Sequence, residues 1–140
     1  VLTPHDLERM LELVEPGTGV IGIQSDALSH LSEYRGMPSF DFFCTLVPYN
    51  VVRELGENKQ VLGMIERYPA VEMFIVDWYL RSKGVIFNVY TTACLHLYQA
   101  DKFKLWHNWS WEKFDHLYRG MRRCDTLEQV DEFLAGEKLL

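Results

Sequence analysis

Hydrophobic residues that recur every three or four positions predict helices at both ends of the chain. The N-terminal apolar stripe consists of Leu7, Met10, Leu11 and Val14. Side chains that can cap helices stand at Thr3, Asn50, Asn58, Ser110 and Asp125, the last with Glu128 as a capping-box partner. The caps at Ser110 and Asp125 predict two helices at the C-terminal end.

Short runs rich in β-branched and aromatic residues predict strands. They span residues 20–23, 40–47, 71–80, 85–90, 93–99 and 103–107. The run 71–80 is ambiguous, because its apolar residues also fit helical spacing and Arg81, Lys83 and Gly84 are typical of a helix C-terminus. Its β-branched and aromatic content and the turn-like residues 82–84 favour a strand that enters a hairpin.

These elements predict one α+β domain over residues 1–140. We expect a mostly antiparallel sheet of about five strands, covered by helices, with two helices at the C-terminal end. A chain of 140 residues can bury a core of its own, and 48% hydrophobic with 24% charged residues is a globular composition.

Charge is distributed unevenly along the chain. The formal net charge is -6, yet residues 102–124 hold six basic and two acidic side chains, a local charge of +4. The remainder of the chain therefore stands at -10. Such asymmetry indicates a surface for an anionic partner.

Aromatic residues alternate with these basic ones, which suggests a binding surface. The candidate partner-binding residues are Trp106, Trp109, Arg119, Arg122 and Arg123. Trp, Tyr and Arg are common anchors of protein interfaces, so our first hypothesis is a non-enzymatic domain that binds a protein partner or its own copy. Single-stranded nucleic acid is a third hypothesis for the same face, limited by the acidic remainder. The competing structural interpretation places the aromatic residues in the core and the basic residues on a solvated helix face.

The second hypothesis is a ligand pocket or an active site between sheet and helices. His96 and His107 would face each other across a hairpin, with Trp78 or Tyr90 lining the cavity. Half-buried histidines bonded to backbone or solvent explain the same pattern. The glycines at 17, 19 and 22 match a dinucleotide motif but follow a helix, so they predict a turn. No motif requires an enzyme, a metal or another cofactor.

Cysteine spacing and hydropathy indicate the cellular compartment of the protein. Cys44, Cys94 and Cys124 are odd in number and widely spaced, so we expect reduced thiols. The longest stretch without charged side chains, residues 84–100, is too polar to span a bilayer. The N-terminal pattern is that of an amphipathic helix instead of a signal peptide. We therefore expect a cytoplasmic protein.

Overall fold

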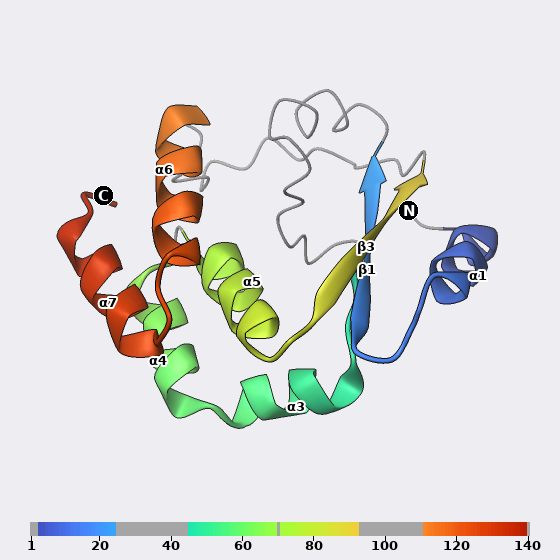
Figure 1. The fold of residues 1–140 in the computed structure, drawn as a ribbon, viewed down its shortest axis with the longest axis horizontal. Helices are drawn as coiled ribbons and strands as arrows, with labels where there is room; N and C mark the ends of the chain where they lie inside the picture. Colours follow the sequence, from blue (N-terminus) through green and yellow to red (C-terminus); the bar gives the residue numbers. More distant parts are fainter. Residues whose placement is uncertain (1–2, 25–44, 70, 93–110, 140) are drawn as a thin grey trace.

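The computed structural model describes residues 3–24, 45–69, 71–92 and 111–139 and shows helices combined with a sheet (Figure 1). The helices in these residues are α1 (Pro4–Glu12), α3 (Tyr49–Glu57), α4 (Lys59–Arg67), α5 (Glu72–Ser82), α6 (Trp111–Arg122) and α7 (Leu127–Gly136). The strands are β1 (Thr18–Gln24), β2 (Thr45–Leu46) and β3 (Ile86–Thr92). This content confirms the expected mixture of helix and strand.

The sheet differs from the expected one in size and in direction. Within the described residues it has three strands, in the order β2-β1-β3, where about five were expected. β1 is antiparallel to β2 but parallel to β3, with Thr18 beside Ile86 and Gln24 beside Thr92. Parallel strands need a long crossover, and the chain between β1 and β3 supplies one that includes α3, α4 and α5. The expected strands 93–99 and 103–107 lie outside the described residues.

Helix α5 overturns the prediction of a strand over residues 71–80. Every residue from Phe74 to Leu80 is buried, so the helix contacts other elements on nearly all sides. A helix that is buried all round shows little amphipathic periodicity, which is why residue composition misled the prediction. The C-terminal signals were correct. Gly84 adopts a φ of 80°, and the Val85 amide donates to the Leu80 carbonyl at 3.1 Å, as in a Schellman ending.

Of the five predicted helix caps, two are confirmed, Asn50 and Asp125 are wrong, and Ser110 lies outside the described residues. The Thr3 hydroxyl accepts from the Asp6 amide, and the Asp6 carboxylate accepts from the Thr3 amide, which closes a capping box. Asn58 accepts from the amides of Gln60 and Val61 at the start of α4. Asn50, however, lies inside α3, which begins directly after Pro48.

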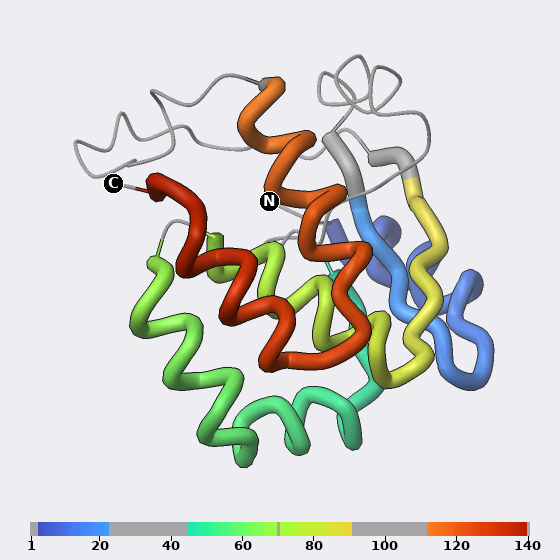
Figure 2. The backbone as a smooth tube through the Cα atoms, turned by 60° about the vertical axis from the view of Figure 1, so that its left-hand side comes forward, coloured from blue at the N-terminus to red at the C-terminus, as the bar shows by residue number. Residues whose placement is uncertain are grey.

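The helices lie unequally on the two faces of the sheet (Figures 1 and 2). Of the described helices, α1 packs beside β1 and β3 at one side of the molecule, while α4, α6 and α7 gather around α5 at the other. The core lies on the α5 side, where Ile21 and Phe87 from the sheet join the buried side chains of the helices. Its fully enclosed members include Val61, Ile75, Leu117, Val130 and Leu134.

Gly19 allows the sheet to carry a bulky ring on its core face. A Cβ at this position would lie 2.5 Å from the Phe87 ring and 2.9 Å from the Leu46 carbonyl oxygen. The Phe87 ring in turn lies beneath the Arg81 guanidinium, whose central carbon is 5.2 Å from the ring centroid. The glycine thus makes room for the contact between β3 and α5.

Candidate interaction site on helix α6

Helix α6 presents a buried side to α5 and an exposed side to solvent. Leu117, Tyr118 and Met121 are buried. The Phe74 ring of α5 meets Phe114 and Tyr118 edge to face, with centroids 6.0 and 5.8 Å apart. These spacings of three and four residues place the apolar contacts on one side of α6, as the sequence predicted.

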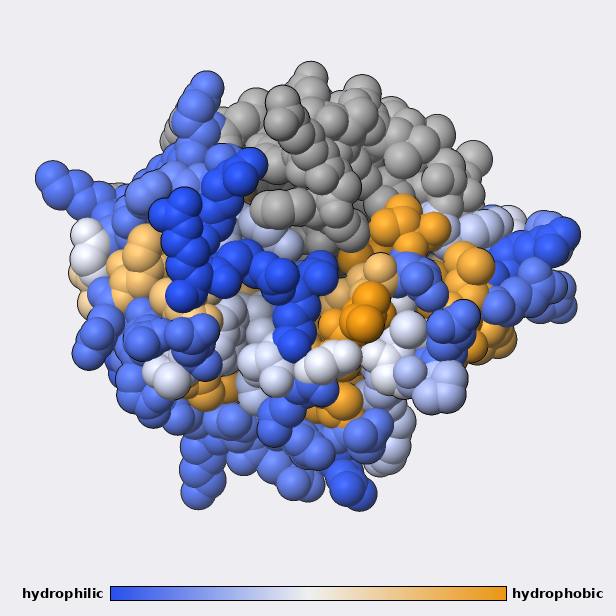
Figure 3. Space-filling model, in the orientation of Figure 1, coloured by the Kyte–Doolittle hydropathy of each residue, from blue (hydrophilic) through white to orange (hydrophobic). Residues whose placement is uncertain are grey.

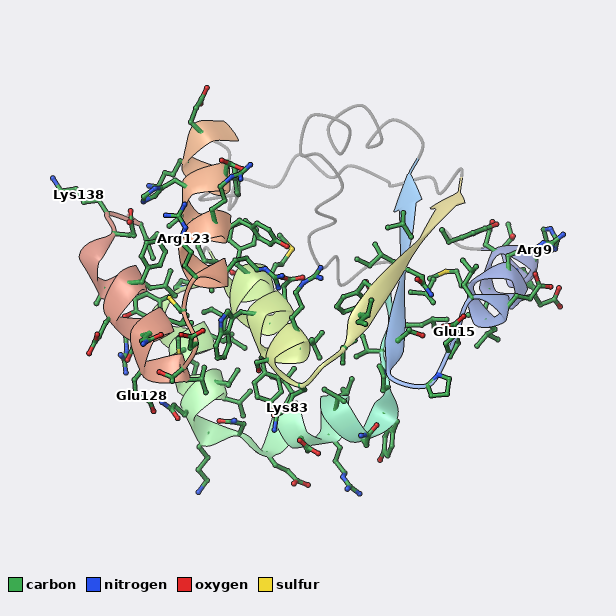
Figure 4. All side chains as sticks on the ribbon, viewed as in Figure 1. Arg9, Glu15, Lys83, Arg123, Glu128 and Lys138 are labelled. Atoms are coloured by element: carbon green, nitrogen blue, oxygen red, sulfur yellow. The ribbon has the colours of Figure 1, made fainter. Side chains whose placement is uncertain are left out.

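Arg119 and Arg122 of α6, and Arg123 directly after the helix, are all exposed. We call these three residues the arginine face. Arg119 donates through Nε to both carboxylate oxygens of Asp115, at 2.7 Å, one turn earlier in the same helix. Within the part of the chain that the structure describes, no ion pair engages the guanidinium of Arg122 or Arg123. The surface around α6 and α7 is mostly hydrophilic (Figure 3), and Arg123 stands at the C-terminal end of α6 (Figure 4).

A buried carboxylate lies beneath the arginine face. Asp77 of α5 is 1% exposed, and Arg81 donates through Nε to both of its oxygens at 3.0 Å. Burial raises the pKa of Tyr118, and the negative charge of nearby Asp77 raises that pKa further. The positive charges of Arg81 and Arg122 oppose this rise. Asp77 is too enclosed to meet a substrate, so the network positions α6 on α5.

The sequence prediction of a pocket lined by the two histidines with Trp78 or Tyr90 stays a prediction, but the structure places both of the latter side chains. Trp78 is buried and donates through Nε1 to the Cys124 carbonyl at 3.0 Å, between α5 and the end of α6. The Tyr90 hydroxyl donates to Asp6 at 3.2 Å, on the α1 side of the sheet. The two residues therefore point away from each other. His96 and His107, the other two predicted pocket residues, lie outside the described residues.

The aromatic part of the predicted interaction surface also lies outside the described residues. Trp106 and Trp109 belong to it, and only the arginine face is placed by the structure. Cys124 follows α6 with a free, half-buried thiol. Its pKa is raised by burial and then by Asp125. Cys44 and Cys94 are among the residues not described.

An open pocket that the sequence did not indicate lies between α4 and α7. It has a volume of about 330 Å³ and includes Arg67, Tyr68, Leu134, Lys138 and Leu139 in its lining. Two of these residues already have a partner, because Arg67 and the Tyr68 hydroxyl both donate to the Asp131 carboxylate, at 2.8 and 2.7 Å. This polar link joins α4 to α7. The Lys138 side chain extends away from the molecule near the C-terminal end of α7 (Figure 4).

One sequence signal could have found part of these networks. Asp77 and Arg81 are spaced for an ion pair on a helix, but the pair is visible only if residues 72–82 are assigned as helical. The link from Asp131 to Arg67 spans 64 residues and has no local signal.

Across residues 3–24, 45–69, 71–92 and 111–139, no group of three or more His, Cys, Asp or Glu side chains is arranged to hold a metal ion. None of the helices in this part of the chain is long and apolar enough to cross a bilayer.

Comparison of the chain with protein-family models, with curated proteins and with solved structures gave no match.

Proposed function

We propose that this domain binds an acidic surface of a protein partner through the arginine face of α6, with Trp106 and Trp109 as aromatic anchors. The observation that supports the proposal is the exposure of Arg122 and Arg123, neither of which has an ion pair among the described residues. The buried side of α6 provides the packing of the helix, so these arginines are available for a partner.

The like charges of the arginine face repel one another, and nearby groups offset part of this repulsion. Like charges one turn apart on a helix destabilise it by roughly 0.2–0.5 kcal/mol per pair, and the helix dipole offsets this near a C-terminus. Arg119 is further compensated by Asp115. An acidic partner would convert the remaining repulsion into attraction, and Arg suits this role because its fork bonds a carboxylate at two points.

A labelled acidic peptide tests the proposal. Binding of a fluorescein-labelled oligoglutamate to the domain would be followed by fluorescence anisotropy at low salt. We expect Arg122→Gln/Arg123→Gln to weaken binding on the order of tenfold, about 1.4 kcal/mol. The matched control is Arg53→Gln/Lys59→Gln, which removes the same charge from exposed positions on α3 and α4.

The control separates a specific face from overall charge. Affinity of the control variant should stay within about twofold of the unmodified domain, because its arginine face is intact. Equal losses in both variants, or no loss in either, would contradict the proposal. Tighter binding of a labelled oligothymidylate than of oligoglutamate would overturn it in favour of the nucleic-acid hypothesis.

A further inference from the structure

Helix α1 exposes apolar side chains that its sequence pattern assigned to the core. Met10 is 1% exposed and packs on the sheet, but Leu7 and Leu11 are 42% and 54% exposed. Val14, just beyond the helix, is 46% exposed. Apolar surface is visible on the side of the molecule where α1 lies (Figure 3). Neighbouring apolar residues exposed on one face are typical of an interaction surface.

The sheet extends this apolar surface. Asn88 donates to the Leu13 carbonyl at 2.9 Å and Tyr90 bonds to Asp6, so both side chains of β3 face α1. Side chains alternate along a strand, which places Ile86 on the same face. Ile86 is 68% exposed. We call Leu7, Leu11, Val14 and Ile86 the α1 patch.

Acidic side chains accompany the α1 patch. Residues 3–15 contain Asp6, Glu8, Glu12 and Glu15 against one arginine, Arg9, a net charge of -3. Arg9 pairs with Glu12 at 2.8 Å, and Asp6 closes the N-terminal cap. Residues 111–123, which include the arginine face, carry four basic and two acidic side chains, a net charge of +2. The two helices are therefore complementary in charge.

The fold keeps these complementary surfaces apart. α1 and α6 lie on opposite sides of the molecule, with the sheet and α5 between them (Figures 1 and 4). One chain cannot bring its own α1 patch to its own arginine face in this arrangement. Two copies can do so if they associate head to tail.

We infer that the acidic partner of the arginine face is the α1 patch of a second copy of this chain. The inference rests on the proposed function of the arginine face and names its partner. The carboxylates beside the patch would meet Arg122 and Arg123, and the apolar residues of the patch would be buried in the interface. Such an interface uses two different surfaces, so each copy keeps one free end and further copies can add.

Sedimentation of two complementary variants tests the inference. Leu11→Ser/Glu15→Gln disables the α1 patch at two exposed positions, and Arg122→Gln/Arg123→Gln disables the arginine face. The unmodified domain should show a mass that rises with protein concentration above the 16.5 kDa monomer and falls with added salt. Each variant alone should remain a monomer. In an equimolar mixture, the intact α1 patch of one variant can bind the intact arginine face of the other. The mixture should therefore form dimers of twice the monomer mass and no larger species.

Three outcomes would overturn the inference. A domain that stays monomeric at every concentration yet still binds oligoglutamate through the arginine face has a different partner, and the proposed function survives. A mixture that stays monomeric while the unmodified domain associates shows that copies meet through other surfaces. An α1 variant that associates like the unmodified domain excludes the α1 patch. Circular dichroism of both variants establishes that they remain folded.

Discussion

Tyr118 packs between α6 and α5, and its hydroxyl can be titrated. The residue is 8% exposed, and its pKa is raised first by burial and then by Asp77. Because the folded pKa lies above the unfolded value of about 10, this hydroxyl contributes stability that is fully present below pH 10. The contribution is lost as the pH rises through the folded pKa.

Spectrophotometric titration of the tyrosines checks this assignment. We expect Tyr118→Phe to remove a component that ionises later than an ordinary tyrosine and coincides with alkaline unfolding. Tyr68 and Tyr90 also have raised pKa values, so the difference between the two titration curves is the informative quantity. If the component that Tyr118→Phe removes has the pKa of an ordinary tyrosine, Tyr118 is exposed to solvent.

Two glycines are expected to respond to alanine with opposite signs. A Cβ at Gly19 meets the Phe87 ring and a backbone oxygen, so Gly19→Ala should destabilise the domain by about 1–3 kcal/mol. Gly63 lies inside α4 with no atom within 4 Å of an added Cβ, so Gly63→Ala should stabilise it by about 0.5–1 kcal/mol. Chemical denaturation measures both. A Gly19→Ala variant that is as stable as the unmodified domain would contradict the described packing of β3 on β1.

At the scale of elements, the start of α7 corrects a predicted cap. Asp125 and Glu128 were expected to form a capping box, but the helix begins one residue later. The Thr126 hydroxyl accepts from the Gln129 amide at 3.3 Å, and the Gln129 side chain accepts from the Asp125 amide at 2.7 Å. Both Asp125 and Thr126 are good cap residues, and pattern alone does not choose between neighbours.

Alanine substitutions distinguish the two capping residues. Thr126→Ala should cost about 1 kcal/mol of unfolding free energy, because it leaves the Gln129 amide without its acceptor. Asp125→Ala should cost less than half as much, since only the backbone of Asp125 takes part in the cap. The midpoints of chemical denaturation give both values. A larger loss for Asp125→Ala would place the cap where the sequence first suggested.

Local chemistry determined which elements the sequence could predict. β1 and β3 were predicted from β-branched runs, and the caps at Thr3 and Asn58 from short side-chain acceptors, because these signals act within a few residues. Helix α5 was predicted as a strand, since burial on all sides adds β-branched and aromatic residues to the apolar residues that fit helical spacing. The parallel pairing of β1 with β3 depends on a crossover of many residues and leaves no local pattern.

The candidate site likewise combines features that lie along one helix with contacts between distant elements. Arg119, Arg122 and Arg123 are exposed, which also fits the interpretation of a solvated helix face, and their role in binding stays a prediction. The pocket predicted to include Trp78 and Tyr90 required knowledge of which face each element presents, and that knowledge comes only from tertiary structure. Spacing along one helix is predictable because its geometry is fixed, whereas contacts between distant elements are not.

At the scale of the whole molecule, the fold separates charge. The acidic helix α1 and the basic helix α6 lie on opposite sides of the sheet and α5, so neither neutralises the other within one chain (Figure 1). Because the tertiary structure separates the two helices, the uneven charge along the sequence becomes a charge difference between two sides of the molecule. The arginine face is the central element of this account.

Nuclear magnetic resonance of the arginine Nε–Hε groups tests that face most directly. Isotope-labelled domain would be titrated with unlabelled oligoglutamate, and each arginine signal would be assigned by substitution. The account predicts that the Arg122 and Arg123 signals shift and saturate with the peptide. The signals of Arg53 on α3 and of Arg67, already bonded to Asp131, should stay in place. Shifts confined to Arg53 or Arg67, or spread evenly over all arginines, would contradict a binding face on α6.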